Sequence, residues 1–216
     1  DLLHQANNQG LTVTADVYPY NASYTGIEIV FPIWAKTEEQ FSLAKKNRRK
    51  ELENYLRERI NLRNGPEATL IGTAPWTGKT LAELAHEFET PFENILIDEI
   101  GPSGASGAYF IMDESLQTRL ISDSLIGISS DGSPTGFHPR GHGTFAKIIE
   151  TYVREKNVFS LSEAIKKMTT YPASILQIKD RGSLTAGMMA DIIIFDPKNV
   201  KARASYTNPF QLAQGF

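Results

Sequence analysis

The stretch IGISSDGSPTGFHPRGHGTF, residues 126–145, is the most informative for the fold. It opens with a short apolar run typical of a buried strand, ends that run at Asp131, and turns at Gly132. A His-Pro-Arg tripeptide follows, ending at Arg140, ahead of a periodic apolar segment. In α/β enzymes, the carboxyl end of a strand is a common place for a carboxylate that carries protons, and a nearby arginine can bind a substrate anion.

Strand and helix patterns alternate outward from this stretch. The expected strands are 11–20, 68–74, 108–112, 125–130 and 190–196. The expected helices are 37–63, 80–88, a short one after Pro91, 114–122, 145–156, and 162–178, the last capped at Ser160 and in two pieces broken at Pro172. This alternation favours an α/β fold with parallel pairing. The two best inner strands are separated by a long, mostly helical stretch, which indicates a barrel or sheet interrupted by an insertion.

The composition excludes several classes of protein. The net charge of -3 predicts no general attraction to nucleic acid or to an anionic membrane. The absence of cysteine excludes disulfides and thiolate metal sites and gives no sign of secretion, so we expect a cytoplasmic protein. No apolar run approaches the roughly 20 residues of a membrane span. The sequence also has no HxH pair and no HExxH motif, so this chain alone is not expected to complete a metal-dependent reaction.

Both ends of the chain fall inside expected elements. It begins at Asp1, without a methionine, in a segment that reads as the end of a helix closing at Gly10. It stops at residue 216 without a completed helix or strand. We expect a piece of a longer protein; a natural chain with a processed start is the alternative.

Two segments suggest phosphate or nucleic-acid binding but have simpler explanations. Residues 72–80, GTAPWTGKT, resemble a P-loop, yet the interval between Gly72 and Gly78 is too long, and Pro75 removes a backbone donor. A helix cap with Thr80 at the cap position is favoured. The basic run 45–50 is flanked by glutamates, so a solvated helix face is favoured over a nucleic-acid patch.

The histidines of the central stretch do not form an obvious metal pair. His138 and His142 have the spacing that would suit a metal on a helix. Pro139, Gly141 and Gly143 argue against a helix there. We therefore expect these histidines to structure the loop or line a pocket.

Each of the remaining polar candidates has either a functional or a purely structural role. Asp131 is either a catalytic carboxylate or a turn residue that ends its strand. Arg140 alone would be a surface arginine in most proteins. Tyr18, Tyr20 and Ser23 follow a strand end, where function is common, but two tyrosines beside a proline are more often packing residues.

A family resemblance favours the functional interpretations. GSLTAGMMADIIIFDP, residues 182–197, resembles the C-terminal signature of the amidohydrolase superfamily, where the chain leaves the barrel for a small β domain. Residues 14–26, 129–145 and 160–176 resemble the D-aminoacylases, also called N-acyl-D-amino-acid deacylases. The resemblance covers nearly the whole chain and is weakest between residues 27 and 105.

The resemblance implies an α/β fold: the C-terminal part of the (β/α)8 TIM barrel of a metal-dependent hydrolase, with an insertion between strands 7 and 8. Residues 1–26 would hold strand 7, and 27–105 a mostly helical insertion. Residues 106–180 would hold strand 8 and the closing helices. Residues 181–216 would return to an incomplete small β domain.

The resemblance also implies roles for individual residues. Asp131 matches the catalytic aspartate, and Arg140 matches the arginine that holds the substrate α-carboxylate. Tyr20, of the YPY motif, would be a second carboxylate contact. Ser23 would lie nearby. His138, for which the sequence favours a loop-structuring or pocket-lining role, is a further candidate for substrate binding.

The chain departs from the family in one respect. The family's zinc ligands, an HxH pair, a cysteine and two further histidines, precede the region present here, as does a lysine that assists carboxylate binding. The resemblance thus implies zinc in the full-length enzyme and none bound by this chain. It also implies hydrolysis of N-acyl-D-amino acids, with an inactive fragment that self-associates. A dihydroorotase- or hydantoinase-like enzyme, which usually lacks the pattern around Arg140, and a non-catalytic globular fragment are the alternatives.

Overall fold

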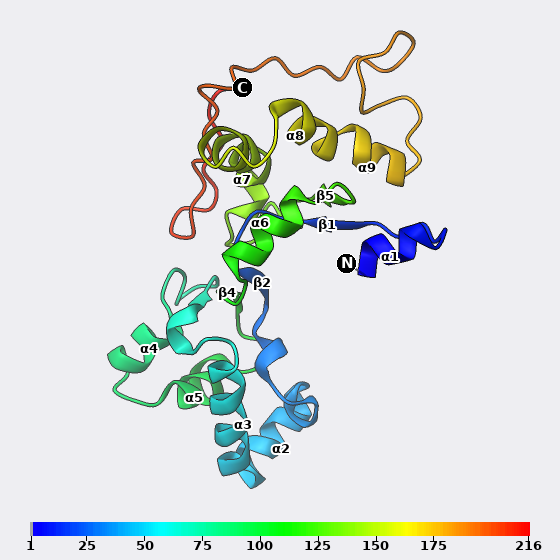
Figure 1. Cartoon of the computed structure of the whole chain (residues 1–216). Coiled ribbons are helices and arrows are strands. Elements are labelled where there is room, and N and C mark those ends of the chain that lie inside the picture. The colour runs from blue at the N-terminus through cyan, green and yellow to red at the C-terminus, as the bar shows by residue number, and fades with distance from the viewer. Residues whose placement is uncertain (1) are drawn as a thin grey trace. The chain divides into compact units, whose positions relative to one another are not determined.

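A computed structural model describes residues 2–216, which form two compact units (Figure 1). Each unit has its own core. Unit 1 comprises the residues up to Tyr20, Asp113–Pro134 and Pro139–Phe216. Unit 2 comprises Asn21–Met112 and Thr135–His138. Together they give the mixed α/β content expected from the sequence.

Two parallel strands organise unit 1. Strand β1 (Ala15–Val17) pairs with β5 (Ile126–Ile128), with Ala15 opposite Ile126 and Val17 opposite Ile128. The strands lie side by side in Figure 1 although most of unit 2 separates them in the sequence. All three residues of β5 are buried, as its apolar sequence predicts. The expected parallel pairing is confirmed for these two strands, but the strands expected at 68–74 and 108–112 pair antiparallel with each other.

The helices of unit 1 are α1 (Leu2–Asn8), α6 (Glu114–Ser122), α7 (Arg140–Lys147), which continues through wide π-type turns at Ile148–Glu155, α8 (Leu161–Met168) and α9 (Thr170–Ile175). Of these, α6, α8 and α9 contact the two strands directly. The core between them contains Ile121, Ile128, Ile148, Tyr152 and Ala164. The apolar spacing of α6 and of residues 145–153 is therefore what fixes these helices on the strands.

The expected break in the last helical segment occurs at a different residue. Ser160 caps α8 in a reciprocal capping box with Glu163, and the expected helix begins there. The chain then breaks at Thr169, whereas we expected the break at Pro172. Pro172 lies in the first turn of α9, where a helix makes no use of the missing N–H.

The expected strand at 190–196 does not form. The segment is irregular and its isoleucines are exposed, with Ile194 at 88%. A strand is held by hydrogen bonds to a neighbouring strand. Among the described residues, no strand pairs with this segment, so its apolar sequence cannot by itself produce the element.

Unit 2 contains an antiparallel sheet with the strand order β2-β4-β3, formed by Ser23–Gly26, Ser106–Tyr109 and Thr69–Ile71. Its helices are α2 (Glu38–Asn47), α3 (Arg49–Asn61), α4 (Leu81–Glu87) and α5 (Phe92–Ile95), the last followed by π-type turns at Leu96–Ile100. Short 3-10 turns occur at Ile27–Val30, Ile33–Ala35 and Pro66–Ala68.

The single long helix expected over 37–63 is two helices separated at Arg48. The backbone of Arg48 has a φ of -133°, outside the helical range. Each helix buries its own apolar positions, Ala44 in α2 and Leu52 and Leu56 in α3. The break lets both helices contact one core. Tyr55, also on α3, is 38% exposed.

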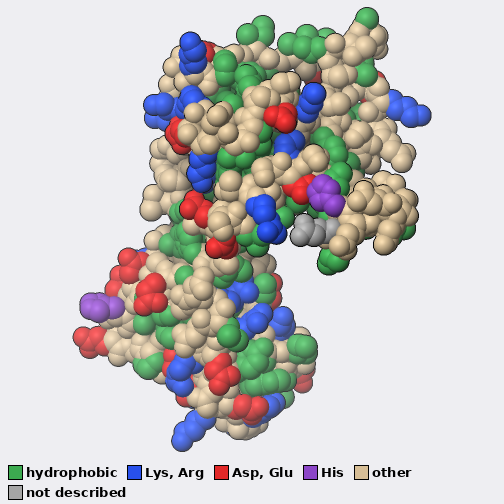
Figure 2. All heavy atoms as spheres, viewed as in Figure 1, with side chains coloured by type: hydrophobic (Ala, Val, Ile, Leu, Met, Phe, Trp, Pro, Cys, Tyr) green, Lys and Arg blue, Asp and Glu red, His purple; other side chains and the backbone are tan. Residues whose placement is uncertain are grey.

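Charged side chains of both signs are interspersed on the face shown in Figure 2. In the basic run, Arg48 pairs with Glu51, and Arg49 pairs with Glu53 and Asp98. These pairs support a solvated helix face. No helix within residues 2–216 has the length and apolar character needed to span a bilayer.

The glycine loop at residues 72–80 ends in a helix cap. Thr80 accepts a hydrogen bond from the backbone N–H of Glu83, and the Glu83 carboxylate accepts one from the Thr80 backbone. The loop therefore leads into α4 through a capping box, as expected.

Candidate functional site

Asp131 and Arg140 form an ion pair in unit 1. Arg140 Nη1 lies 2.8 Å from Asp131 Oδ2. Asp131 follows β5 and has a φ of +46°, in the left-handed region that aspartate tolerates better than most residues. Arg140 is the first residue of α7. The central stretch thus brings together the two charged residues that the sequence singled out.

Arg140 is nearly enclosed. Its residue exposure is 8%, and its Cζ lies 4.9 Å from the centre of the Tyr18 ring. Burial raises the pKa of the Tyr18 hydroxyl, while the charge of Arg140 and a hydrogen bond from it act in the opposite direction. A guanidinium stacked on a ring and paired with a carboxylate is held in a fixed orientation.

Contrary to our expectation, residues 140–147 are helical despite Gly141 and Gly143. Tertiary packing explains the glycines. A Cβ on Gly141 would lie 2.7 Å from the Ser133 carbonyl oxygen, and one on Gly132 would lie 2.8 Å from the Gly141 Cα. The first turn of α7 therefore packs directly on the loop that carries Asp131, and this contact outweighs the low helix propensity of glycine.

Tyr20 packs against the start of α7. It is 3% exposed, and its hydroxyl donates to the Pro139 carbonyl oxygen at 3.4 Å. Burial, followed by the charge of Glu150, raises the pKa of its hydroxyl. The Lys147 ammonium lies 4.3 Å from the centre of its ring, and burial lowers the pKa of Lys147. Tyr18, rather than Tyr20, is the tyrosine whose ring Arg140 covers.

Gln117 is a supporting residue that the sequence did not reveal. It is 4% exposed on α6, and its Nε2 donates to the backbone carbonyls of Tyr18 (3.0 Å) and Tyr20. Gln117 lies one turn before Ile121, on the same buried face of α6. A polar residue at an apolar position of a helix could have identified Gln117 from the sequence. Gln117 fixes the backbone that carries both tyrosines.

Ser23 and His138 belong to unit 2. The Ser23 Oγ is buried and has no hydrogen-bond partner among the described residues. His138 is 2% exposed, its Nε2 lies 3.1 Å from the Ala22 carbonyl oxygen, and its ring meets that of Tyr24 edge-on. Asp131, Arg140 and Tyr20 thus share one unit, and Ser23 and His138 share the other.

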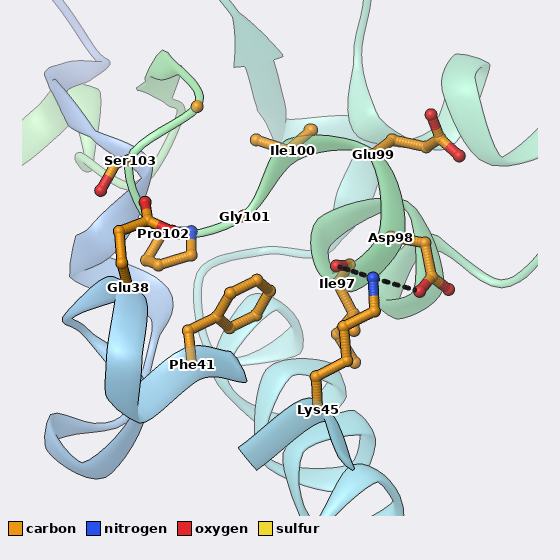
Figure 3. A pocket seen from close by; sticks show the side chains of 11 residues that line it. Glu38, Phe41, Lys45, Ile97, Asp98, Glu99, Ile100, Gly101, Pro102 and Ser103 are labelled. Carbon is orange, nitrogen blue, oxygen red and sulfur yellow. Dashed lines mark hydrogen bonds and ion pairs between the residues drawn. The ribbon is translucent and has the colours of Figure 1, made fainter. Parts of the chain in front are cut away.

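Unit 2 also has a shallow cavity of about 300 Å³ beside α2 (Figure 3). The Lys45 ammonium faces it and contacts the Asp98 carboxylate at 2.9 Å and the Ile97 carbonyl oxygen at 3.3 Å. Its charge is thus already matched within the protein. Nothing in this cavity points to chemistry.

The described residues offer no complete metal site. Within residues 2–216, no three histidine, cysteine, aspartate or glutamate side chains gather in a group that could hold a metal ion. His142 packs edge-on against Phe210, and its Nδ1 is buried without a hydrogen-bond partner in the same range. The residues that the structure describes therefore do not fit a complete zinc site of the kind that the family resemblance implies.

Residues 66–212 match the model of a family described as the amidohydrolase family, and the chain belongs to that family. A curated relative, the N-acyl-D-aspartate deacylase of Alcaligenes xylosoxydans xylosoxydans, is 38% identical over 141 residues, which are 64% of this chain and 28% of the relative. The resemblance drawn from the sequence is confirmed.

Comparison with solved structures gives the same family of enzymes as the sequence comparison. The N-acyl-D-glutamate deacylase of Bordetella bronchiseptica, solved with zinc and a phosphonate inhibitor, matches 99% of this chain at 25% identity and a TM-score of 0.76. A crystal structure of D-aminoacylase matches 99% of it at 27% identity and a TM-score of 0.75. The chain spans 39% of each of those chains, well under half of the proteins it resembles.

Proposed function

We propose that the protein containing this chain is a zinc-dependent amidohydrolase that cleaves the amide bond of N-acyl-D-amino acids, releasing a carboxylate and a D-amino acid. The observation that carries the proposal is the Asp131–Arg140 pair at the end of a buried parallel strand. It places a carboxylate able to exchange protons beside a cation able to bind a substrate anion. The deacylases similar to this chain support the choice of substrate.

In this proposal Arg140 binds the α-carboxylate of the substrate, and Asp131 carries a proton. The planar guanidinium matches two carboxylate oxygens. Its burial at 8% exposure removes competing water, which strengthens the pairing. Tyr18 lies against Arg140 and its hydroxyl shares a hydrogen bond with it, which supports a second contact from this hydroxyl to the same carboxylate. Asp131 is reachable, with its side chain 64% exposed.

Zinc, when bound, supplies a hydroxide nucleophile at neutral pH. Its ligands would come from parts of the protein outside this chain, because no suitable group occurs among residues 2–216. What this chain contributes is therefore proton transfer and substrate orientation.

We also propose that β1 and β5 are strands 7 and 8 of a (β/α)8 barrel, with unit 2 inserted between them. The parallel register and the buried face of β5 support this placement. The chain leaves unit 1 after Tyr20 and returns at Asp113, as an insertion requires.

The test is an assay of the full-length protein loaded with zinc. We expect hydrolysis of N-acyl-D-amino acids, with little activity on the L-enantiomers or on cyclic amides such as dihydroorotate and hydantoins. Preference for a cyclic amide would instead identify a dihydroorotase- or hydantoinase-like enzyme. The isolated chain should bind no stoichiometric zinc; near-equimolar tight binding by elemental analysis would contradict its assignment as the part without the metal ligands.

A further inference from the structure

Tyr20 fills a space that exists only because residue 143 is glycine. A Cβ built on Gly143 would lie 2.4 Å from the Tyr20 hydroxyl oxygen, a distance that requires one of the two to move. The same Cβ would lie 3.4 Å from the Ala204 Cβ and 3.7 Å from the Tyr20 Cζ, which neighbouring atoms can accommodate. The conflict is therefore with the hydroxyl alone.

That hydroxyl contacts the start of the helix that bears Arg140. It donates to the carbonyl of Pro139, the residue immediately before Arg140. On the other side, Gln117 holds the backbone carbonyl of Tyr20. Tyr20, a residue that is 3% exposed, thus connects α6, through its backbone carbonyl, to the start of α7, through its hydroxyl.

We propose that Tyr20 is a positioning residue for Arg140: by holding the Pro139 carbonyl, its hydroxyl sets where the guanidinium meets the substrate carboxylate. The inference deepens the proposed function and rests on it. Tyr20 acts through Pro139, while Tyr18 is the tyrosine in direct contact with the guanidinium. Two-point recognition of a carboxylate depends on orientation, so a small shift of α7 weakens it more than it weakens a simple charge attraction.

The test compares three variants of the zinc-loaded full-length enzyme: Tyr20→Phe, Gly143→Ala and the double variant. The readout is the ratio of kcat/KM for an N-acyl-D-amino acid to that for its carboxamide analogue, which lacks the carboxylate. A general loss of stability lowers both values and leaves the ratio unchanged. We expect each single variant to lower the ratio on the order of tenfold.

The double variant is the decisive measurement. With phenylalanine at position 20, the added Cβ meets no hydroxyl, so the double variant should be no worse than Tyr20→Phe. Independent structural damage would instead multiply the two effects. Tyr55→Phe, a half-exposed tyrosine on α3 of unit 2, is the matched control and should leave the ratio unchanged. Unchanged ratios in both single variants, or multiplied losses, would overturn the proposal.

A second readout does not depend on catalysis. Arg140 is almost inaccessible, so it should react slowly with an arginine-selective dicarbonyl reagent, followed by peptide mass spectrometry. Tyr20→Phe should accelerate its modification several-fold, and Tyr55→Phe should not. If the enzyme hydrolyses no N-acyl-D-amino acid, the proposed function fails while this measurement still tests Tyr20. An unchanged rate would refute the positioning role.

Discussion

Asp131 and Arg140 lie 2.8 Å apart but differ sharply in their exposure, with 64% of the aspartate side chain and 10% of the arginine side chain accessible. Arg140 is held by the Tyr18 ring and by the packing of α7. Arg140 is therefore the fixed group, and Asp131 is the group that water and substrate can reach. This asymmetry suits a buried anion holder beside an accessible proton carrier.

Asp131→Asn in the full-length enzyme should lower kcat on the order of a thousandfold and leave the zinc content unchanged. Asparagine preserves the shape and the tolerance of positive φ but cannot take up a proton at neutral pH. Steady-state kinetics with elemental analysis provides the check. Asp196→Asn is the control, because Asp196 is an exposed aspartate whose side chain accepts a backbone hydrogen bond in a turn. Retained turnover would show that Asp131 only ends its strand.

Arg140→Lys should reduce kcat/KM for N-acyl-D-amino acids far more than for their carboxamides. Lysine offers a point charge in place of the planar fork, and losing a buried charge-assisted pair costs about 2–5 kcal/mol. Arg119→Lys, an exposed arginine on α6, should change neither value. Equal losses for both substrates would mean that Arg140 holds the loop together and does not contact the carboxylate.

The sequence predicted what local patterns determine. The buried strand β5, its parallel partner and the capping boxes of α4 and α8 follow from apolar spacing and cap residues. The helix at 140–147 was not expected because helix propensity takes no account of tertiary packing: a Cβ on Gly141 would meet the Ser133 carbonyl, and one on Gly143 would meet the Tyr20 hydroxyl. Residues 190–196 have the composition of a strand, but strand formation depends on a partner that local sequence does not reveal.

At the candidate site, the two tyrosines of the YPY motif also have roles that local sequence does not reveal. Tyr18 and Tyr20 are two positions apart, so an extended chain directs both to one side and their spacing cannot separate their roles. Contacts distant in sequence distinguish them: Arg140 covers the ring of Tyr18, and the Pro139 carbonyl accepts from Tyr20.

Asp98 should make the stability of unit 2 sensitive to acid. Hydrogen bonds from Arg49, and then from Lys45, lower the pKa of Asp98 to about 2, below its ordinary value of 3.8. A lowered pKa means that the stabilisation is complete above about pH 4 and is lost as the pH falls towards about 2. Because the pairs are solvent-exposed, Asp98→Asn should lower the free energy of unfolding at neutral pH by about 1 kcal/mol or less.

Urea unfolding of the full-length enzyme and its Asp98→Asn variant at several pH values between neutral and acid provides the check. The difference in stability should shrink as the pH falls through this window. Glu99→Gln is the matched control, since Glu99 is the exposed neighbouring carboxylate. A difference that is constant with pH would show that the ion pairs contribute nothing measurable.

The isolated chain should self-associate through residues 192–194. These three isoleucines are 59%, 72% and 88% exposed, and a contiguous apolar patch of this kind promotes association in water. Replacing Ile192 and Ile194 with lysine should shift the chain towards monomer in sedimentation velocity, because charges resist both apolar contact and edge pairing. Ile33→Lys removes an equally exposed isoleucine, at 84%, from unit 2 and should not have this effect. A wild-type chain that is a stable monomer and binds no hydrophobic dye would contradict the prediction. Equal effects of both substitutions would assign the association to general surface hydrophobicity, and not to this segment.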